Sequence, residues 1–172
     1  LPCAVNQALE FLYRKNKEWE GSEKYWNDRY KSGGNSGTGS YNRLAEFKAK
    51  TINDFVKEHK INSVIEWGCG DGNQLSLLKF PHYVGYDVSE MAVELCRKKF
   101  VGDSSKKFLC CKNNEIISKQ KADLVLSLDV IYHLVENEIY ETYMERLFAS
   151  SDKYVCIYSC DYDDDFSDHV RC

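Results

Sequence analysis

Three glycines at every second position, Gly68, Gly70 and Gly72, separate two apolar segments of the chain. The run before them, Ser63–Ile65, is typical of a buried strand, and the run after them, Asn73–Leu78, is typical of the first turns of a helix. Glycines at a strand-to-helix turn allow unusual backbone conformations and a close approach of the main chain to a ligand. The sequence therefore predicts a ligand site at the end of the first strand of an α/β unit.

Two acidic residues frame this glycine segment. Glu66 precedes it, and Asp87 ends the next apolar run, about 20 residues further on, a spacing that suits a carboxylate binding ribose hydroxyls. A dinucleotide site requires Gly-x-Gly-x-x-Gly, but here the third glycine comes one residue early. Glu66 would also lie beside a phosphate as a like charge. A nucleoside ligand that is positively charged and carries no phosphate fits the segment better.

Strand and helix patterns alternate along most of the chain. Strands are predicted over residues 62–67, 83–87, 107–111, 123–128 and 153–159, and helices over residues 42–59, 73–79, 89–100 and 134–149, with helical spacing also in residues 4–31. This alternation predicts an α/β fold, a Rossmann-like parallel sheet with helices on both faces. The carboxyl ends of the strands then bring the glycine segment, Asp87, Asn113 and Asp129 to one crevice.

The 172 residues are expected to form a single domain. Residues 1–40 would contain N-terminal helices and the glycine-rich segment Gly33–Ser40, residues 41–160 the Rossmann-like core, and residues 161–172 an acidic tail. The glycine-rich segment is either a linker or a lid. Aromatic and basic residues flank it, which favours a lid beside a ligand site.

The composition indicates which partners the protein binds and in which cellular compartment it is found. The net charge is −4, whereas a nucleic-acid partner would favour a basic face. No apolar run approaches the roughly 18–20 residues of a membrane helix, and the N-terminus lacks the pattern of a signal peptide. The eight cysteines form neither Cys-x-x-Cys nor a zinc module, so we expect reduced thiols. A cytoplasmic protein without membrane insertion and without a nucleic-acid partner is the resulting expectation.

The motif Glu-x-Gly-x-Gly-x-Gly, followed by an acid at the end of the second strand, resembles class I methyltransferases that depend on S-adenosylmethionine (SAM). The resemblance covers residues of about 25–160. It implies SAM as the cofactor, with the glycines at 68, 70 and 72 beside the methionine moiety and Glu66 near its positive groups. It also implies that Asp87 binds the ribose hydroxyls and that Val88 borders the adenine.

Further cofactor contacts are expected from residues around this motif. Asn113 stands where the family often has an acid that reads the adenine amino group, and Asp129 ends the fourth strand at the crevice. Arg43 is a candidate for bidentate binding of the SAM carboxylate, and Tyr30 is a candidate for stacking on cofactor or substrate. An ordinary surface or core position is the alternative for both side chains.

Residues 25–48 show a narrower resemblance, to small methyltransferases of bacterial and viral glycan assembly, including domains fused to chlorovirus glycosyltransferases. It implies an O-methyltransferase that acts on a sugar hydroxyl of a glycan or nucleotide-sugar, fused to or acting with glycosyltransferases. The alternatives are metal-dependent methylation of another small molecule or an RNA end, and a non-catalytic SAM-binding domain. Five of the family's seven strands are recognisable, so the C-terminal strands are either missing or lie beyond Cys172.

The catalytic candidates follow the fourth predicted strand. Asp129 and His133 are four residues apart, so a helical turn would place them on one face, and His169 follows the fifth strand near the same rim. His133 is then a general base oriented by Asp129, or the three residues hold Mg²⁺ or Mn²⁺ that activates the substrate hydroxyl, or they are structural. The metal site resembles that of small-RNA 2′-O-methyltransferases, with Tyr132 in place of the second acid of their Glu-x-x-Glu-His motif.

Overall fold

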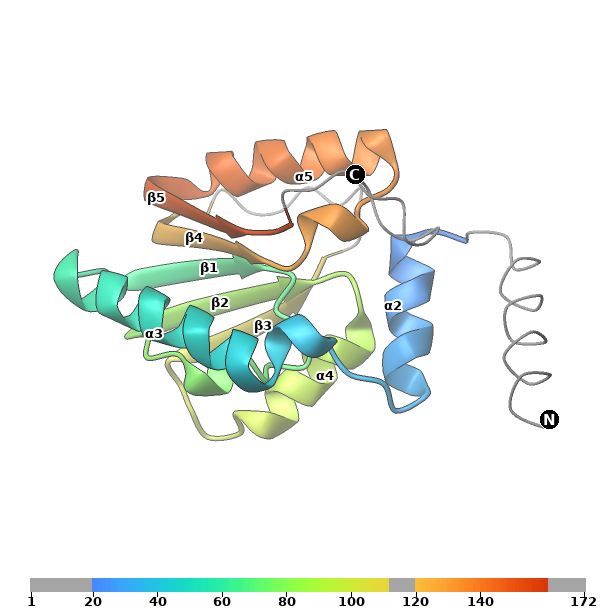
Figure 1. The fold of residues 1–172 in the computed structure, drawn as a ribbon, viewed down its shortest axis with the longest axis horizontal. Helices are drawn as coiled ribbons and strands as arrows, with labels where there is room; N and C mark the ends of the chain where they lie inside the picture. Colours follow the sequence, from blue (N-terminus) through green and yellow to red (C-terminus); the bar gives the residue numbers. More distant parts are fainter. Residues whose placement is uncertain (1–19, 112–119, 161–172) are drawn as a thin grey trace.

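The computed structural model describes residues 20–111 and 120–160, which are built around one five-stranded sheet (Figure 1). The sheet order is β3-β2-β1-β4-β5, and every neighbouring pair is parallel. The strands are β1 (Ser63–Trp67), β2 (His82–Asp87), β3 (Lys106–Cys110), β4 (Ala122–Leu128) and β5 (Ser151–Tyr158). This topology is the predicted Rossmann-like α/β fold.

Helices cover both faces of the sheet because the central strands bury side chains on both sides. The described helices are α2 (Ser22–Lys31), α3 (Asn42–Glu58), α4 (Glu90–Lys99) and α5 (Asn137–Ala149). Val64 of β1 lies in one apolar core with residues of α3 and α4, and Ile65 lies in a second core with Leu147 of α5. Figure 1 accordingly shows α5 on one face, α3 and α4 on the other, and α2 beyond the carboxyl ends of the strands.

The start of α4 shows how local sequence places a residue at the crevice. The Ser89 side chain accepts a hydrogen bond from the Ala92 N–H at 3.3 Å and so caps the helix. Glu90 in the first turn and three basic residues in the last turn complement the helix dipole. The capped end follows β2 directly, so the backbone after Asp87 is held in one conformation.

The helix predicted over residues 73–79 is wrong, because only one 3₁₀ turn, Leu75–Leu77, forms there. Leu78 then adopts extended dihedral angles, φ −100° and ψ 147°. The side chain of Asn53 in α3 donates to the Leu77 carbonyl at 2.9 Å and accepts from the Lys79 N–H at 2.8 Å. These bonds stabilise the extended exit, and Pro81 disfavours helix in the residue before it.

Several sequence predictions fall outside the described residues, namely any helix in residues 1–19, the Asn113 contact, and the acidic tail with His169. The six cysteines within the described ranges take part in no disulfide bond there. No helix in those ranges is both long and apolar enough to cross a bilayer.

Candidate active site

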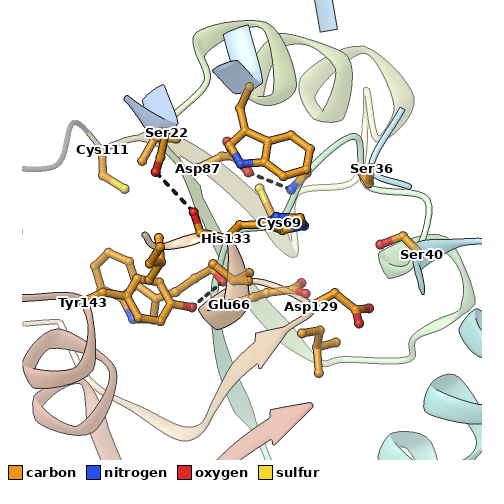
Figure 2. A pocket seen from close by; sticks show the side chains of 18 of the residues that line it. Ser22, Ser36, Ser40, Glu66, Cys69, Asp87, Cys111, Asp129, His133 and Tyr143 are labelled. Atoms are coloured by element: carbon orange, nitrogen blue, oxygen red, sulfur yellow. Dashed lines mark hydrogen bonds between the residues drawn. The ribbon is translucent and has the colours of Figure 1, made fainter. Parts of the chain in front are cut away.

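A cavity opens where the carboxyl ends of β1, β2 and β4 meet α2 (Figure 2). It contains about 990 Å³ of space when the open solvent at its mouth is counted. Eight of the residues singled out in the sequence line it: Tyr30, Glu66, Gly68, Gly70, Asp87, Val88, Asp129 and His133. The fold therefore brings together side chains that lie up to a hundred residues apart in the chain.

Two of the predicted cofactor residues do not line this cavity. A Cβ on Gly72 would lie 2.8 Å from Phe100 and 3.0 Å from the Cys96 sulfur, so Gly72 serves the packing of the glycine loop against α4. Arg43 is exposed, because it lies two residues before the buried Ala45 and so on the opposite side of α3. The described structure gives Arg43 no contact with the cavity.

The glycines that line the cavity are required by close approaches of the main chain. Gly68 and Gly70 have φ of 85° and 55°, in the left-handed region. A Cβ on Gly68 would lie 2.4 Å from a methyl of Val130, and one on Gly70 would lie 2.3 Å from Ser36 Oγ. The absence of side chains at Gly68 and Gly70 therefore lets the main chain of this loop approach Val130 and Ser36 closely at the wall of the cavity.

Asp87 is held by main-chain donors on both carboxylate oxygens. One oxygen accepts from the Gly70 N–H at 2.9 Å and the other from the Ser89 N–H at 2.8 Å. The residue is only 7% exposed. Burial raises the pKa of Asp87 to about 6, although these two hydrogen bonds oppose the rise. The glycine loop and the capped start of α4 thus fix the orientation of the Asp87 carboxylate in the lining of the cavity.

Glu66 lies deeper, at 2% exposed, where it accepts a hydrogen bond from the Tyr83 hydroxyl. Burial raises the pKa of Glu66 to about 7, while the Tyr83 bond and the charge of Lys48 act in the opposite direction. The nearby carboxylates of Asp87 and Asp129 add to the rise. Three acids therefore share one electrostatic environment at the base of the cavity.

Lys48 is a site residue that the sequence analysis missed. It is 2% exposed and forms an ion pair with Asp129 at the end of β4. Its Nζ also lies 5.0 Å from the centre of the Tyr158 ring. The available signal was a lysine among the buried positions of α3, between Ala45 and Ile52. A lysine on the buried face of a helix requires a buried anion as its partner, and here that anion is Asp129.

His133 does not stack on Asp129 in a helical turn, so that prediction is wrong. Asp129 has φ of 59°, the next element is a single 3₁₀ turn over Ile131–His133, and α5 begins only at Asn137. Within the described residues the Asp129 carboxylate contacts Lys48 and, at 3.4 Å, the Tyr132 hydroxyl, not the His133 ring. The His133 ring instead meets the Trp26 ring edge-on, with 5.0 Å between centroids.

The described side chains do not provide the predicted metal site. Within residues 20–111 and 120–160, no three His, Cys, Asp or Glu side chains are grouped as metal ligands. The Asp129 oxygen that would coordinate a metal already faces the Lys48 ammonium. His169, the third predicted ligand, lies outside the described residues.

Helix α2 lines the cavity through Ser22, Trp26 and Tyr30, and it is hydrogen-bonded to the segment around His133 and Glu136. Glu136 accepts from the Ser22 N–H at 3.2 Å and from the Ser22 hydroxyl at 2.9 Å. The same hydroxyl donates to the His133 carbonyl at 3.3 Å, a contact drawn in Figure 2. Because Ser22 begins α2, these bonds fix the position from which Trp26 reaches His133.

The charges around the cavity favour a cationic ligand. Its lining contains three acids, Glu66, Asp87 and Asp129, and one basic residue, Arg146. The glycine loop presents no lysine or arginine to a phosphate, and its neighbouring acids would repel one. A ribose with a positively charged substituent fits this set of donors and acceptors, as SAM would.

Comparison with known proteins supports this assignment. The family model described as a methyltransferase domain matches residues 65–152, about half of the chain. Among solved structures, the methyltransferase domain of bacterial CtHen1-C has 22% identity and a TM-score of 0.59, covering 67% of this chain and 65% of its own. Streptomyces venezuelae DesVI has 18% identity and a TM-score of 0.60, with coverage of 87% and 62%.

SAM-bound CalS10 from Micromonospora echinaspora, described as an amino pentose methyltransferase of calicheamicin biosynthesis, has 16% identity and a TM-score of 0.56, covering 71% of this chain and 51% of its own. The chain thus spans about half to two thirds of the length of these structures. No curated protein matches it. From its family match and its fold, the chain belongs to the methyltransferase domain family and has the Rossmann-like fold of class I SAM-dependent methyltransferases.

Proposed function

We propose that this chain binds SAM in the acid-lined cavity and transfers its methyl group to a sugar hydroxyl of a glycan or nucleotide-sugar. The observation that carries the proposal is the arrangement of Asp87, held between the Gly70 and Ser89 amides in a cavity lined by three acids, of which only Asp129 is paired with a lysine. A ribose hydroxyl needs such an acceptor, and a sulfonium needs a site without competing cations.

In this proposal the two halves of SAM are held by different parts of the cavity. The main chain around Gly68 and Gly70 lies beside the methionine moiety, Asp87 accepts from the ribose, and Val88 borders the adenine. Glu66 contributes negative charge beneath the positive groups. When bound, SAM supplies a methyl group already activated on a sulfonium, so the protein mainly orients the reactants and manages one proton.

His133 is the residue best placed to accept the proton of the acceptor hydroxyl. Its ring is in the cavity lining and is packed against Trp26. A neutral imidazole nitrogen accepts the hydroxyl proton while the oxygen attacks the methyl carbon. The Asp129 carboxylate is paired with Lys48, so the general-base role does not depend on Asp129 as its orienting group.

The lining of the cavity also suits a sugar. Trp26 and Tyr143 contribute aromatic surface, and Ser40 contributes a hydroxyl group. Aromatic faces combined with small polar groups suit the apolar faces and hydroxyls of a sugar ring. CalS10, an amino pentose methyltransferase, has a similar fold. We therefore retain the glycan-assembly role, with glycosyltransferases as partners, within the proposal.

The direct test is product analysis by mass spectrometry. The chain is incubated with methyl-labelled SAM and a panel of monosaccharides and nucleotide-sugars, and a product carrying one labelled methyl group is expected from at least one sugar. His133→Ala should lower kcat by about 10²-fold or more without changing SAM affinity. His82→Ala is the matched control, because His82 is exposed at the start of β2.

The outcomes separate the possible functions. Methylation of a non-sugar acceptor only would contradict the sugar assignment. SAM binding without turnover against any acceptor would leave a non-catalytic SAM-binding domain. Equal kcat in wild type and His133→Ala would remove His133 from the chemistry.

A further inference from the structure

The segment of residues 33–41, here called the strap, lies against the glycine loop on one side of the cavity. Ser36 and Ser40 of the strap are part of the cavity lining, and Figure 2 shows both on the same side of it. The strap connects α2 to α3, so it also joins the helix that carries Trp26 to the helix that carries Lys48. Its position determines whether this side of the cavity is closed.

One carboxylate binds the strap to the glycine loop. Asp71 accepts hydrogen bonds from the Ser36 N–H at 3.0 Å and from the Tyr41 hydroxyl at 2.8 Å, and its own N–H donates to Ser36 Oγ at 3.0 Å. It also accepts from the Asn73 N–H at 2.9 Å, which orients the carboxylate. Asp71 is 7% exposed. The middle of the strap and its C-terminal end are therefore both bound to one residue of the loop.

Further contacts make the closed arrangement specific. Tyr30 in α2 is hydrogen-bonded to Ser36 Oγ at 3.0 Å, and the Asn73 side chain donates to the Ser40 carbonyl at 2.7 Å. Ser36 Oγ lies only 2.3 Å from the place a Cβ on Gly70 would occupy. The strap thus contacts the same stretch of main chain that lines the proposed methionine site.

The backbone of the strap is suited to opening. Gly33 and Gly37 have φ of 81° and 87°, and a Cβ built on either would have no atom within 4 Å. Packing therefore does not restrain these two positions, in contrast to Gly70. Gly34 and Gly39 are packed, since a Cβ there would lie 2.8 Å from Arg29 and 2.5 Å from Asp129. Glycines at unpacked positions can absorb large dihedral changes, so Gly33 and Gly37 are the positions at which the strap can bend once its hydrogen bonds are broken.

The protonation state of Asp71 strengthens its hydrogen bonds to Ser36 and Tyr41, which together are called the latch. Burial alone would raise its pKa, but the hydrogen bonds from Asn73, Tyr41 and Ser36 outweigh burial and lower the pKa. The carboxylate is thus ionised near neutral pH, and hydrogen bonds to an ionised acceptor are roughly twice as strong as neutral ones.

We propose that Asp71 is a positioning residue that holds the strap closed over the cavity and so sets the rate at which the cofactor leaves. The inference rests on the proposed SAM site. Asp71, which lies between Gly70 and Gly72, would then retain the cofactor through its bonds to Ser36 and Tyr41 and not by touching the cofactor itself.

The test measures dissociation of S-adenosylhomocysteine, the expected product, by stopped-flow with intrinsic tryptophan fluorescence, since Trp26 and Trp67 line the cavity. Asp71→Asn keeps the size of the side chain but removes its charge, and we expect dissociation to accelerate about tenfold. Tyr41→Phe removes one of the bonds and should give about a threefold increase. Asp54→Asn is the matched control, because Asp54 pairs with Lys50 on the exposed face of α3 and is 68% exposed.

The double variant Asp71→Asn/Tyr41→Phe tests whether Tyr41 and Asp71 act through the same hydrogen bond. Because Tyr41 acts through Asp71, the double variant should dissociate no faster than Asp71→Asn alone. Melting temperatures of all variants are measured in parallel. A lower melting temperature with an unchanged dissociation rate in Asp71→Asn would reduce Asp71 to a structural residue and overturn the proposal.

If Asp71→Asn fails to fold, Tyr41→Phe and Ser36→Ala decide, since each removes only part of the latch, and wild-type dissociation rates in both would overturn it. No binding of the ligand by the wild-type chain would instead contradict the proposed function, so the two failures are distinguishable.

Discussion

Asp87 and Asp129 occupy equivalent places, each at the carboxyl end of a strand in the cavity wall, but they are held in different ways. Asp87 is held by main-chain N–H groups of Gly70 and Ser89. Asp129 is held by the side chain of Lys48, which reaches it from α3. The first carboxylate therefore depends on the shape of a loop, whereas the second depends on one buried cation.

This difference separates the two sides of the cavity by function. A carboxylate bound by neutral amides keeps its full negative charge for a ligand, so the β2 side suits a cofactor contact. A carboxylate paired with an ammonium is largely neutralised and rigidly placed, so the β4 side supports the fold and offers little attraction to a metal. The predictions below test this division, from the largest expected effect to the smallest.

Replacing Lys48 should be the most damaging change, because it leaves Asp129 as a buried charge without its partner. Lys48→Met is expected to lower the free energy of unfolding by about 3–5 kcal/mol, measured by urea denaturation. Lys50→Met is the matched control two residues away, where the lysine is 82% exposed, and should change stability by no more than about 0.5 kcal/mol.

The double variant Lys48→Met/Asp129→Asn should recover much of that loss, since removing both partners leaves no uncompensated charge. If Lys48→Met were no more destabilising than Lys50→Met, the Lys48–Asp129 ion pair would not stabilise the cavity wall at the end of β4.

Substituting Gly70 tests the other side of the cavity, where the conformation of the glycine loop holds Asp87. Both Gly70→Ala and Gly102→Ala place a side chain at positive φ, 55° and 87°, but only the Cβ on Gly70 meets another atom. Strain alone should cost about 1 kcal/mol in Gly102→Ala. In Gly70→Ala the collision with Ser36 should add about 1–3 kcal/mol and displace the loop that holds Asp87. Calorimetry should find SAM binding weakened only in Gly70→Ala; equal affinity in the two variants would contradict the loop's role.

The pH dependence should be opposite for stability and for binding. The folded-state pKa values of Asp87 and Glu66 are raised to about 6 and about 7, whereas unfolded carboxyls titrate near about 4. The unfolded chain therefore loses these protons first, so this contribution to stability falls as pH rises from about 4 to about 7. A bound cation favours the ionised carboxylates, so SAM affinity should rise over about pH 5.5–7.5.

Melting curves with and without SAM check this prediction across that range. The increase in melting temperature caused by SAM should grow with pH, and Asp87→Asn should flatten the part of the response centred near pH 6. A SAM-induced shift that is independent of pH would show that the bound ligand does not favour the ionised forms of Asp87 and Glu66.

The same division explains which features could be predicted from the sequence. The strands, the glycine loop and Asp87 follow from short-range patterns, because apolar runs, glycine spacing and main-chain donors act between near neighbours. The Lys48–Asp129 pair joins residues 81 positions apart, and nothing close to Asp129 in the chain indicates its partner.

The errors have the same origin. The short turn after Gly72 depends on Asn53 in another helix, so apolar spacing alone predicted too long a helix there. The left-handed backbone of Asp129 prevented the helical stacking with His133 that a four-residue spacing suggested. Arg43 was favoured for its place beside the glycine-rich segment, but the buried positions of α3 turn it to the surface.

The central claim, that the cavity beside Asp87 is a SAM site, is tested most directly by isothermal titration calorimetry of the intact chain with SAM. The account predicts binding of one SAM per chain, weakened at least about tenfold in Asp87→Ala, with no comparable binding of a phosphate-bearing dinucleotide. Absence of SAM binding by the wild-type chain, or an unchanged affinity in a folded Asp87→Ala variant, would contradict it.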